Sequence, residues 1–262
     1  MAKQLNPKTT TGFVPLPGPV LSPEILAQDT LAELRKISDP RKAQGAQKYF
    51  KNEVRVMGAE TEDLRVLAKT QFGRVKGRWT FAQATSLCEI LLNNPYLEAK
   101  AAGVLILGRF VADAHPVFFL KMRNWLEGGL LDNWASTDTL CGEVLSPFVA
   151  RFPELRYQFK SWTESPNLWV QRASAVVLVP FARRGQWLDL AYDVAARLVP
   201  SREDLIHKAS GWLLREAGKT NMGRLEKYLR ANGSKTPRTT IRYAIEKFDA
   251  KKRKALLAAT SR

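Results

Sequence analysis

Two residues near the middle of the chain, Trp134 and Asp138, are of types that together could act on a cationic substrate. They are four positions apart, so on a helix they would lie one above the other on the same face. A carboxylate can stabilise developing positive charge and orient or deprotonate water, while an indole face attracts cations. At this spacing, however, a core tryptophan beside a solvated acid is the commoner arrangement, so the pair alone is a weak signal.

Two later segments carry similar side chains. Trp169 and Arg172 open an apolar run, in which Arg172 must either reach solvent or find an anionic partner. Asp138 and a DNA phosphate are the available classes of partner. Trp212 follows Gly211, and a glycine lets a neighbouring helix or a substrate approach closely. Taken singly, each of these segments indicates packing more often than function.

The elements that must position these residues are predicted to be helices. Apolar residues recur at helical spacing in nearly every segment after Ser22, and no window alternates as a strand would. The fold class is therefore predicted to be all-α. Helix-start signals occur at Ser22-Pro23-Glu24, Thr80 with Gln83, Ser201 with Asp204, and Thr236-Pro237. Helix-stop signals occur at Gly73, Gly77, Asn93-Asn94-Pro95, Gly128-Gly129, Gly185 and Asn232-Gly233.

These signals divide the chain into about a dozen helices of roughly 10 to 18 residues, most joined by very short turns. Such spacing favours antiparallel helix pairs stacked side by side, so we expect an α-solenoid with one row of helices lining a concave groove. No consensus repeats at a fixed period, and spacing alone favours this arrangement over a compact bundle. Basic residues on these helices would make the groove basic; they include Arg172, Lys208, Arg215, Lys219, Arg238 and Arg242.

The charge balance points to a polyanionic partner. The chain has 41 Lys and Arg against 25 Asp and Glu, a formal net charge of +16. The stretch from Arg215 to Arg262 holds 14 basic and 4 acidic side chains, so it carries +10 of that total. Clustered positive charge favours nucleic acid or, less often, an anionic membrane surface, although basic side chains can also simply keep a protein soluble.

Several classes of protein are disfavoured by what the sequence lacks. Cys88 and Cys141 have no nearby Cys or His at ligand spacing, and His115 lies far from His207, so no disulfide framework, metal site or cofactor is expected. No apolar stretch approaches the roughly 18 to 20 residues that span a bilayer, and the N-terminus has no apolar signal core. A soluble cytoplasmic protein, associated with the nucleoid, is therefore expected.

The chain divides into three parts on composition. Residues 1–21, with four prolines among Thr, Gly and Lys, are predicted to be a flexible N-terminal arm. Residues 22–249 carry the helical pattern and form the predicted domain. Residues 250–262 are predicted to be a basic C-terminal tail.

Five segments, in order along the chain, resemble the DNA alkylation repair family of HEAT-like-repeat DNA glycosylases, often called the AlkD family. The resemblance covers about residues 22–249, and its specificity lies in the order of the segments rather than in any one of them. The chain departs from the family just before Trp212, where aromatic residues are common and this chain has Asp204-Leu205-Ile206. That difference bears on contacts at this rim and on lesion preference. The segments are 48–52, 133–138, 168–172, 208–216 and 237–248.

The resemblance implies an α-solenoid of HEAT-like helix pairs that wraps duplex DNA containing alkylated bases. It implies hydrolysis of the N-glycosidic bond of cationic alkylpurines, chiefly N7-alkylguanine and N3-alkyladenine, with the lesion staying largely in the duplex. Asp138 would be the catalytic carboxylate, with Trp134 and Trp212 as aromatic walls beside the lesion. No lyase activity is expected, because the motifs place no lysine as a Schiff-base nucleophile. A monomer is expected, because a solenoid that wraps DNA needs no partner subunit. The residues expected to contact DNA are Arg172, Tyr49, Lys51, Lys208, Arg215, Arg238 and Arg242.

Two other functions stay open at this point. A non-enzymatic helical-repeat scaffold for branched or damaged DNA would keep the groove without needing Asp138. A HEAT-like protein-interaction module would instead have an apolar or mixed groove. Base release from methylated DNA separates the first of these from a glycosylase, and the charge of the concave face separates the second.

Overall fold

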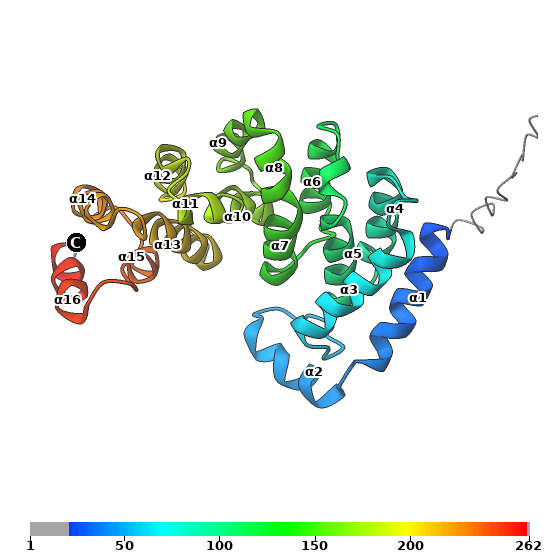
Figure 1. Cartoon of the computed structure of the whole chain (residues 1–262). Coiled ribbons are helices and arrows are strands. Elements are labelled where there is room, and N and C mark those ends of the chain that lie inside the picture. The colour runs from blue at the N-terminus through cyan, green and yellow to red at the C-terminus, as the bar shows by residue number, and fades with distance from the viewer. Residues whose placement is uncertain (1–20, 261–262) are drawn as a thin grey trace, which may run out of the picture.

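The computed structural model describes residues 21–260, and every regular element within them is a helix. The prediction of an all-α protein is confirmed for this part of the chain. One isolated bridge joins Arg55 to Tyr96. The predicted N-terminal arm, residues 1–21, lies outside the described residues except for Leu21. Figure 1 shows helices that follow one another in chain order along the length of the molecule.

The N-terminal part begins with α1, which starts where the sequence predicted. The Oγ atom of Ser22 accepts a hydrogen bond from the backbone N–H of Ile25, and Pro23 occupies the first helical position. The predicted capping box of Thr80 and Gln83 opens α4. Helices α3, α4 and α5 pack against one another and against α1. The elements are α1 (Pro23–Lys36), α2 (Pro40–Ala46), the 3-10 helix η1 (Gln47–Tyr49), α3 (Thr61–Val75), α4 (Phe81–Leu92) and α5 (Leu97–Gly108).

The central part contains the largest fully buried side chains, Trp162, Phe148 and Phe159. The ring of Phe119 stacks on that of Trp162 at 5.3 Å between centroids, which joins α6 to α9. The elements are η2 (Val111–Asp113), α6 (Phe118–Glu127), α7 (Trp134–Leu140), the π-helix η3 (Cys141–Leu145), α8 (Ser146–Arg151), η4 (Pro153–Tyr157), α9 (Gln158–Trp162) and α10 (Leu168–Val176).

The C-terminal part is organised around α13, which packs against α10, α11, α12 and α15. The basic segment that starts at residue 250 forms α16, whose Leu256 is buried, and α16 packs against α14. The elements are α11 (Val179–Arg183), α12 (Leu188–Arg197), α13 (Asp204–Gly218), α14 (Met222–Asn232), α15 (Arg238–Ala244) and α16 (Ala250–Ala259).

Some helix boundaries differ from the prediction. Gly73 does not end a helix but lies inside α3, which continues to Val75. Ser201 does not cap α13; its Oγ accepts from the N–H of Glu203, and the helix begins at Asp204. Many helices are also shorter than expected. One reason is that prolines inside apolar stretches, such as Pro180, begin a new helix because they have no N–H to donate.

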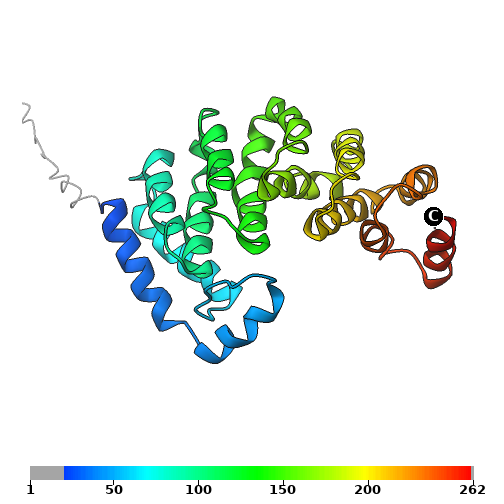
Figure 2. The same ribbon diagram turned by 180° about the vertical axis from the view of Figure 1, so that it is seen from behind.

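Helix α2 and the residues after it lie on a different side of the molecule from α8, α9 and α12 (Figure 1 and Figure 2). In both Figure 1 and Figure 2, α2 lies at the lower edge of the molecule, while α8, α9 and α12 lie at the upper edge. The chain after α2 runs back toward α5, where Leu97 donates its N–H to the carbonyl oxygen of Arg55 at 2.9 Å. This return brings the residues around Tyr49 next to α7, and so to the candidate site.

Candidate active site

A cleft of about 1010 Å³ brings together most of the residues that the sequence singled out. One wall is formed by η1 and the residues after it, and the opposite wall by α7, α10 and α13. Arg238 and Arg242, on α15, do not line it. The predicted residues that do line it are Tyr49, Lys51, Trp134, Asp138, Arg172, Lys208, Trp212 and Arg215.

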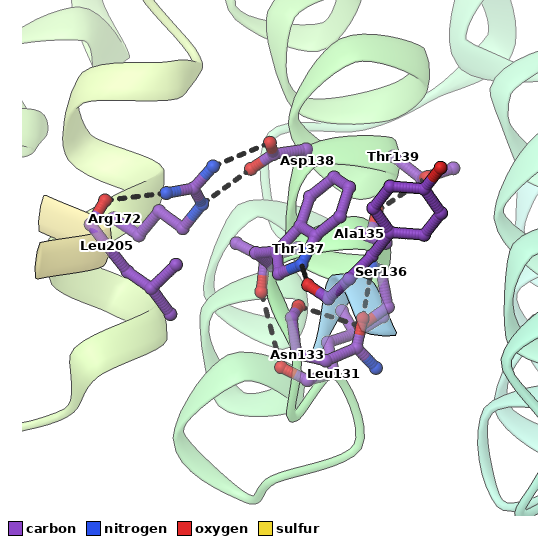
Figure 3. A network of polar contacts seen from close by, with 11 residues as sticks. Leu131, Asn133, Ala135, Ser136, Thr137, Asp138, Thr139, Arg172 and Leu205 are labelled. Atoms are coloured by element: carbon purple, nitrogen blue, oxygen red, sulfur yellow. Dashed lines mark hydrogen bonds and ion pairs between the residues drawn. The ribbon is translucent and has the colours of Figure 1, made fainter. Parts of the chain in front are cut away.

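The first turn of α7 is held by its own polar side chains, as Figure 3 shows. The Oδ1 atom of Asn133 accepts from the N–H of Ser136 at 2.9 Å, which caps the helix. The Oγ1 atom of Thr137 donates to the carbonyl oxygen of Leu131 at 3.3 Å. Asn133, Ser136 and Thr137 are buried, so this network fixes where α7 begins. It thereby fixes the position of Asp138, one turn into the helix.

Trp134 is the first residue of α7, and its indole is fixed from the other wall of the cleft. Its Nε1 donates to the carbonyl oxygen of Tyr49 at 3.2 Å. Its ring stacks on Phe50, with centroids 5.5 Å apart and planes 22° from parallel. The two walls are therefore in direct contact at Trp134.

Arg172 and Asp138 form a bidentate ion pair across α10 and α7 (Figure 3). The guanidinium Nε donates to Oδ1 and Nη2 donates to Oδ2, both at 2.8 Å. The third nitrogen, Nη1, donates to the carbonyl oxygen of Leu205 at 2.6 Å. Arg172 is 5% exposed. Of the two classes of partner open from the sequence, Asp138 is the one present here, and contact between Arg172 and DNA stays a prediction.

Burial and charge act in opposite directions on Asp138. Burial raises the pKa of its carboxyl above the usual value, and the hydrogen bonds and charge of Arg172 oppose that rise. Cys141 lies one turn further along, and burial raises the pKa of its thiol well above its usual range. The thiol is therefore protonated at neutral pH and is a poor nucleophile. Of these two groups, only Asp138 lines the cleft, and a carboxylate has the chemistry to act on a cation.

The other cations of the cleft are paired to different degrees. Lys208 contacts Asp204 at 2.8 Å, and this bond raises the pKa of the lysine and lowers that of the carboxyl. Arg215 is hydrogen-bonded to Glu246. Lys51 is exposed on the opposite wall. Lys208 and Arg215 therefore have carboxylate partners in the free protein, and water-screened pairs of this kind contribute little to stability.

Trp212 is half-buried and packs against the core while lining the cleft. Gly211, the residue before it, allows α15 to approach α13 closely. A Cβ atom on Gly211 would lie 2.5 Å from the Cβ of Tyr243 and 2.7 Å from the carbonyl oxygen of Thr240. Because Gly211 has no side chain, α15 can pack against α13 at this point and bring Tyr243 to the cleft.

The structure adds cleft residues to which sequence reasoning assigned no role. Phe50 and Trp169 add aromatic surface, and Trp169 carried a signal, since it lies three residues before Arg172 on the same helix. The sequence around Lys100 gave no indication of a place in the cleft, because this lysine lies in a mostly apolar segment. It is buried, and its Nζ donates to the carbonyl oxygen of Leu130 at 2.6 Å, close to the start of α7.

Residues 21–260 lack two further kinds of feature. No group of three or more His, Cys, Asp or Glu side chains there is arranged to hold a metal ion. No helix in that range is long and apolar enough to cross a membrane.

Comparison with known proteins connects the chain to DNA repair. Residues 30–248 match the model of a family described as DNA alkylation repair enzyme. A solved structure, a predicted DNA alkylation repair enzyme from Enterococcus faecalis, is similar with a TM-score of 0.71 and 16% sequence identity. The match covers 81% of this chain and 97% of that one, and at this identity it shows the fold alone. No curated protein matches the chain significantly.

Proposed function

This chain belongs to the family of DNA alkylation repair enzymes, and from that membership we propose that it is a monofunctional DNA glycosylase. Its substrates would be cationic alkylated purines in duplex DNA, chiefly N7-alkylguanine and N3-alkyladenine. The observation that carries the proposal is the carboxylate of Asp138 in a cleft that Trp134 and Trp212 also line.

The proposed reaction needs one carboxylate. An alkylated purine with a cationic ring is a good leaving group, because the electron pair of the breaking N-glycosidic bond neutralises it. Water forms the new bond to the sugar carbon, and Asp138 would stabilise the positive charge that develops on the sugar and orient the water or accept its proton. Each carboxylate oxygen accepts more than one hydrogen bond, so the pair with Arg172 leaves acceptor sites on Asp138.

The tryptophans would select for charge. An indole face attracts a cation by about 0.5 to 2 kcal/mol, depending on how far water is excluded. A neutral nucleotide gains less from the same ring, so Trp134 and Trp212 would favour the alkylated base and the charged sugar over undamaged DNA. The fixed ring of Trp134 supports this role, because a preformed surface costs little entropy on binding.

Binding to DNA would rest on phosphate contacts. The order of helices in Figures 1 and 2 supports an α-solenoid of HEAT-like antiparallel pairs, with the cleft as part of a basic concave groove. Tyr49, Lys51, Lys208 and Arg215 line the cleft and are the proposed DNA contacts, together with Arg238 and Arg242 on α15. Binding should therefore weaken steeply as salt concentration rises and show little base preference.

The test is release of base from methylated duplex DNA. Asp138→Asn should lower the rate of release by about 10²- to 10³-fold, because an amide cannot stabilise the cation or accept the proton. DNA affinity should change much less, and it is measured alongside by fluorescence anisotropy. Equal release by the two proteins, or none by the wild type on any lesion of a panel, contradicts the proposal.

A second candidate is a scaffold that binds damaged or branched DNA without cleaving it. One observation favours it: in the free protein, Arg172 occupies both oxygens of Asp138. A purely structural ion pair would have this geometry as well. DNA binding without base release on any cationic lesion would support this candidate and exclude the glycosylase.

A further inference from the structure

The wall of the cleft opposite α7 is a segment without regular structure. Residues 50–58, which we call the cleft loop, connect η1 to the residues before α3. Residues 50–55 line the cleft. A segment without helical hydrogen bonds must satisfy its backbone groups in another way. Two side chains from outside the loop, Gln47 and Glu98, do this.

Gln47 closes the first half of the cleft loop. Its Nε2 donates to the carbonyl oxygen of Asn52 at 2.8 Å, and its Oε1 accepts from the N–H of Val54 at 3.1 Å. One side chain thus satisfies a donor and an acceptor of the loop at once. Because Gln47 begins η1, the loop is tied back to the element that carries Tyr49.

Glu98 holds the second half. Its Oε2 accepts from the N–H of Met57 at 2.8 Å and its Oε1 from the N–H of Gly58 at 2.7 Å. The residue is 3% exposed, and these two hydrogen bonds offset the cost of burying its polar head group. It lies in the first turn of α5, where the positive end of the helix dipole favours an anion.

The same turn of α5 reaches both walls of the cleft. Glu98 holds the cleft loop, and Lys100 binds the carbonyl oxygen of Leu130, three residues before Asn133 caps α7. The two walls then meet directly, since Trp134 donates to Tyr49 and stacks on Phe50. The distance between them is therefore set in part from α5.

We propose that Glu98 is a positioning residue that holds the cleft loop against Trp134 and so sets the affinity of the cleft for DNA. It touches no substrate and acts through the backbone of Met57 and Gly58. The substrate named here rests on the proposed function, whereas the placement of the loop does not.

The test is Glu98→Gln, which keeps the shape of the side chain. The amide turns an N–H₂ group toward one of the two backbone N–H donors, so at least one hydrogen bond is lost. Hydrogen exchange at Met57 and Gly58 should become faster, and the dissociation constant for duplex DNA should rise about tenfold. Single-turnover base release at saturating DNA should change less than about threefold, because Asp138 stays in place.

Two further variants make the result specific. Glu62→Gln is the matched control, because Glu62 is also a glutamate of a first helical turn but is exposed, on α3; its affinity and exchange should equal the wild type's. Gln47→Ala releases the first half of the loop without touching the buried carboxylate. It should also weaken DNA binding, so the proposal stays testable if Glu98→Gln fails to fold.

The outcomes separate the two proposals. Faster exchange at Met57 and Gly58 with unchanged DNA affinity overturns the positioning role, as does an unchanged affinity for Gln47→Ala. A fall in the single-turnover rate with unchanged affinity overturns it too. If the wild type binds DNA but releases no base, the glycosylase proposal fails, and the exchange and affinity measurements still decide the role of Glu98.

Discussion

The wall of the cleft that carries Asp138, Arg172 and Trp212 is built from packed helices, whereas the opposite wall is a loop held by two side chains. On the helical wall, each of these residues sits on an element whose other face is buried in the core. On the loop wall, Tyr49 is 66% exposed and its surroundings depend on Gln47 and Glu98. The helical wall holds the group that would do chemistry together with some proposed DNA contacts, whereas Tyr49 and Lys51 on the loop wall are proposed DNA contacts only.

This division has a physical reason. A catalytic carboxylate must be held within a fraction of an ångström, which packed helices do well. A DNA-contacting loop can be held by few bonds and open locally at low cost, because it buries little apolar surface. Damage to the helical wall should therefore affect stability and chemistry together. Damage to the loop wall should affect mainly affinity.

The largest expected effect follows from Arg172→Gln on the helical wall. The carboxylate of Asp138 would remain buried without its cation, so the free energy of unfolding at neutral pH should fall by about 3 to 5 kcal/mol. Urea unfolding measures this change. Arg78→Gln, an exposed arginine, is the control and should be close to neutral.

The same variant changes the pH dependence of activity. In the proposed reaction Asp138 acts in its ionised form, so base release should be lost as the pH falls through its raised pKa. Loss of Arg172 raises that pKa further, because the group that opposes the effect of burial is gone. The acidic limb of the pH–rate profile should move to higher pH, and the stability deficit should shrink as the pH is lowered, since the folded state then binds the proton more readily. Superimposable profiles would show that the pair does not tune Asp138.

An intermediate effect is expected for Gly58→Ala on the loop wall. Gly58 has φ of 87°, and a Cβ there would overlap the carbonyl oxygen of Asp39. Gly77 has φ of 73°, so an alanine there would also have a strained backbone, but its Cβ would meet no other atom. Gly77→Ala should cost about 1 kcal/mol of stability, and Gly58→Ala about 2 to 3 kcal/mol.

Only the variant in the loop should also weaken DNA binding. Thermal unfolding and fluorescence anisotropy with both alanine variants make the comparison. Equal losses of stability and unchanged affinity for the two would mean that the cleft loop tolerates displacement, and the contrast between the walls would not hold.

What the sequence predicts well is local. Ser22 and Thr80 begin helices because each cap lies within three residues of its partner. Trp134 and Asp138 stand out because their spacing alone places them on one helical face. That spacing alone is a weak signal, and the prediction that Trp134, Asp138, Arg172 and Trp212 share one site came from the resemblance of the ordered segments.

The loop wall depends on contacts between distant parts of the chain. Glu98 bonds an amide 40 positions away, and as a glutamate near a helix start it looks like an ordinary dipole-favoured acid. The partner of Arg172 was open for the same reason, because Asp138 lies 34 positions before it. The prediction that Gly73 ends a helix was wrong, because a helix tolerates an internal glycine when the packing of the helix compensates for the low helix propensity of glycine.

The smallest effects are expected for Arg238 and Arg242, two residues of α15 that do not line the cleft. Arg242 is exposed and lies outside the cleft, so we expect it to contact DNA phosphate and not the alkylated base. Arg242→Gln should weaken binding by a similar factor for every DNA sequence and lower the slope of log affinity against log salt by about 1.

Arg238, on the same helix, donates to the carbonyl oxygen of Leu257 at 2.8 Å, near the end of α16. Its charge and its other N–H groups stay available to phosphate, so Arg238→Gln should cost about 1 kcal/mol of stability and also lower the salt slope by about 1. Salt titrations of the two variants compare them directly, and an unchanged slope for Arg238→Gln would assign Arg238 to α16 rather than to DNA.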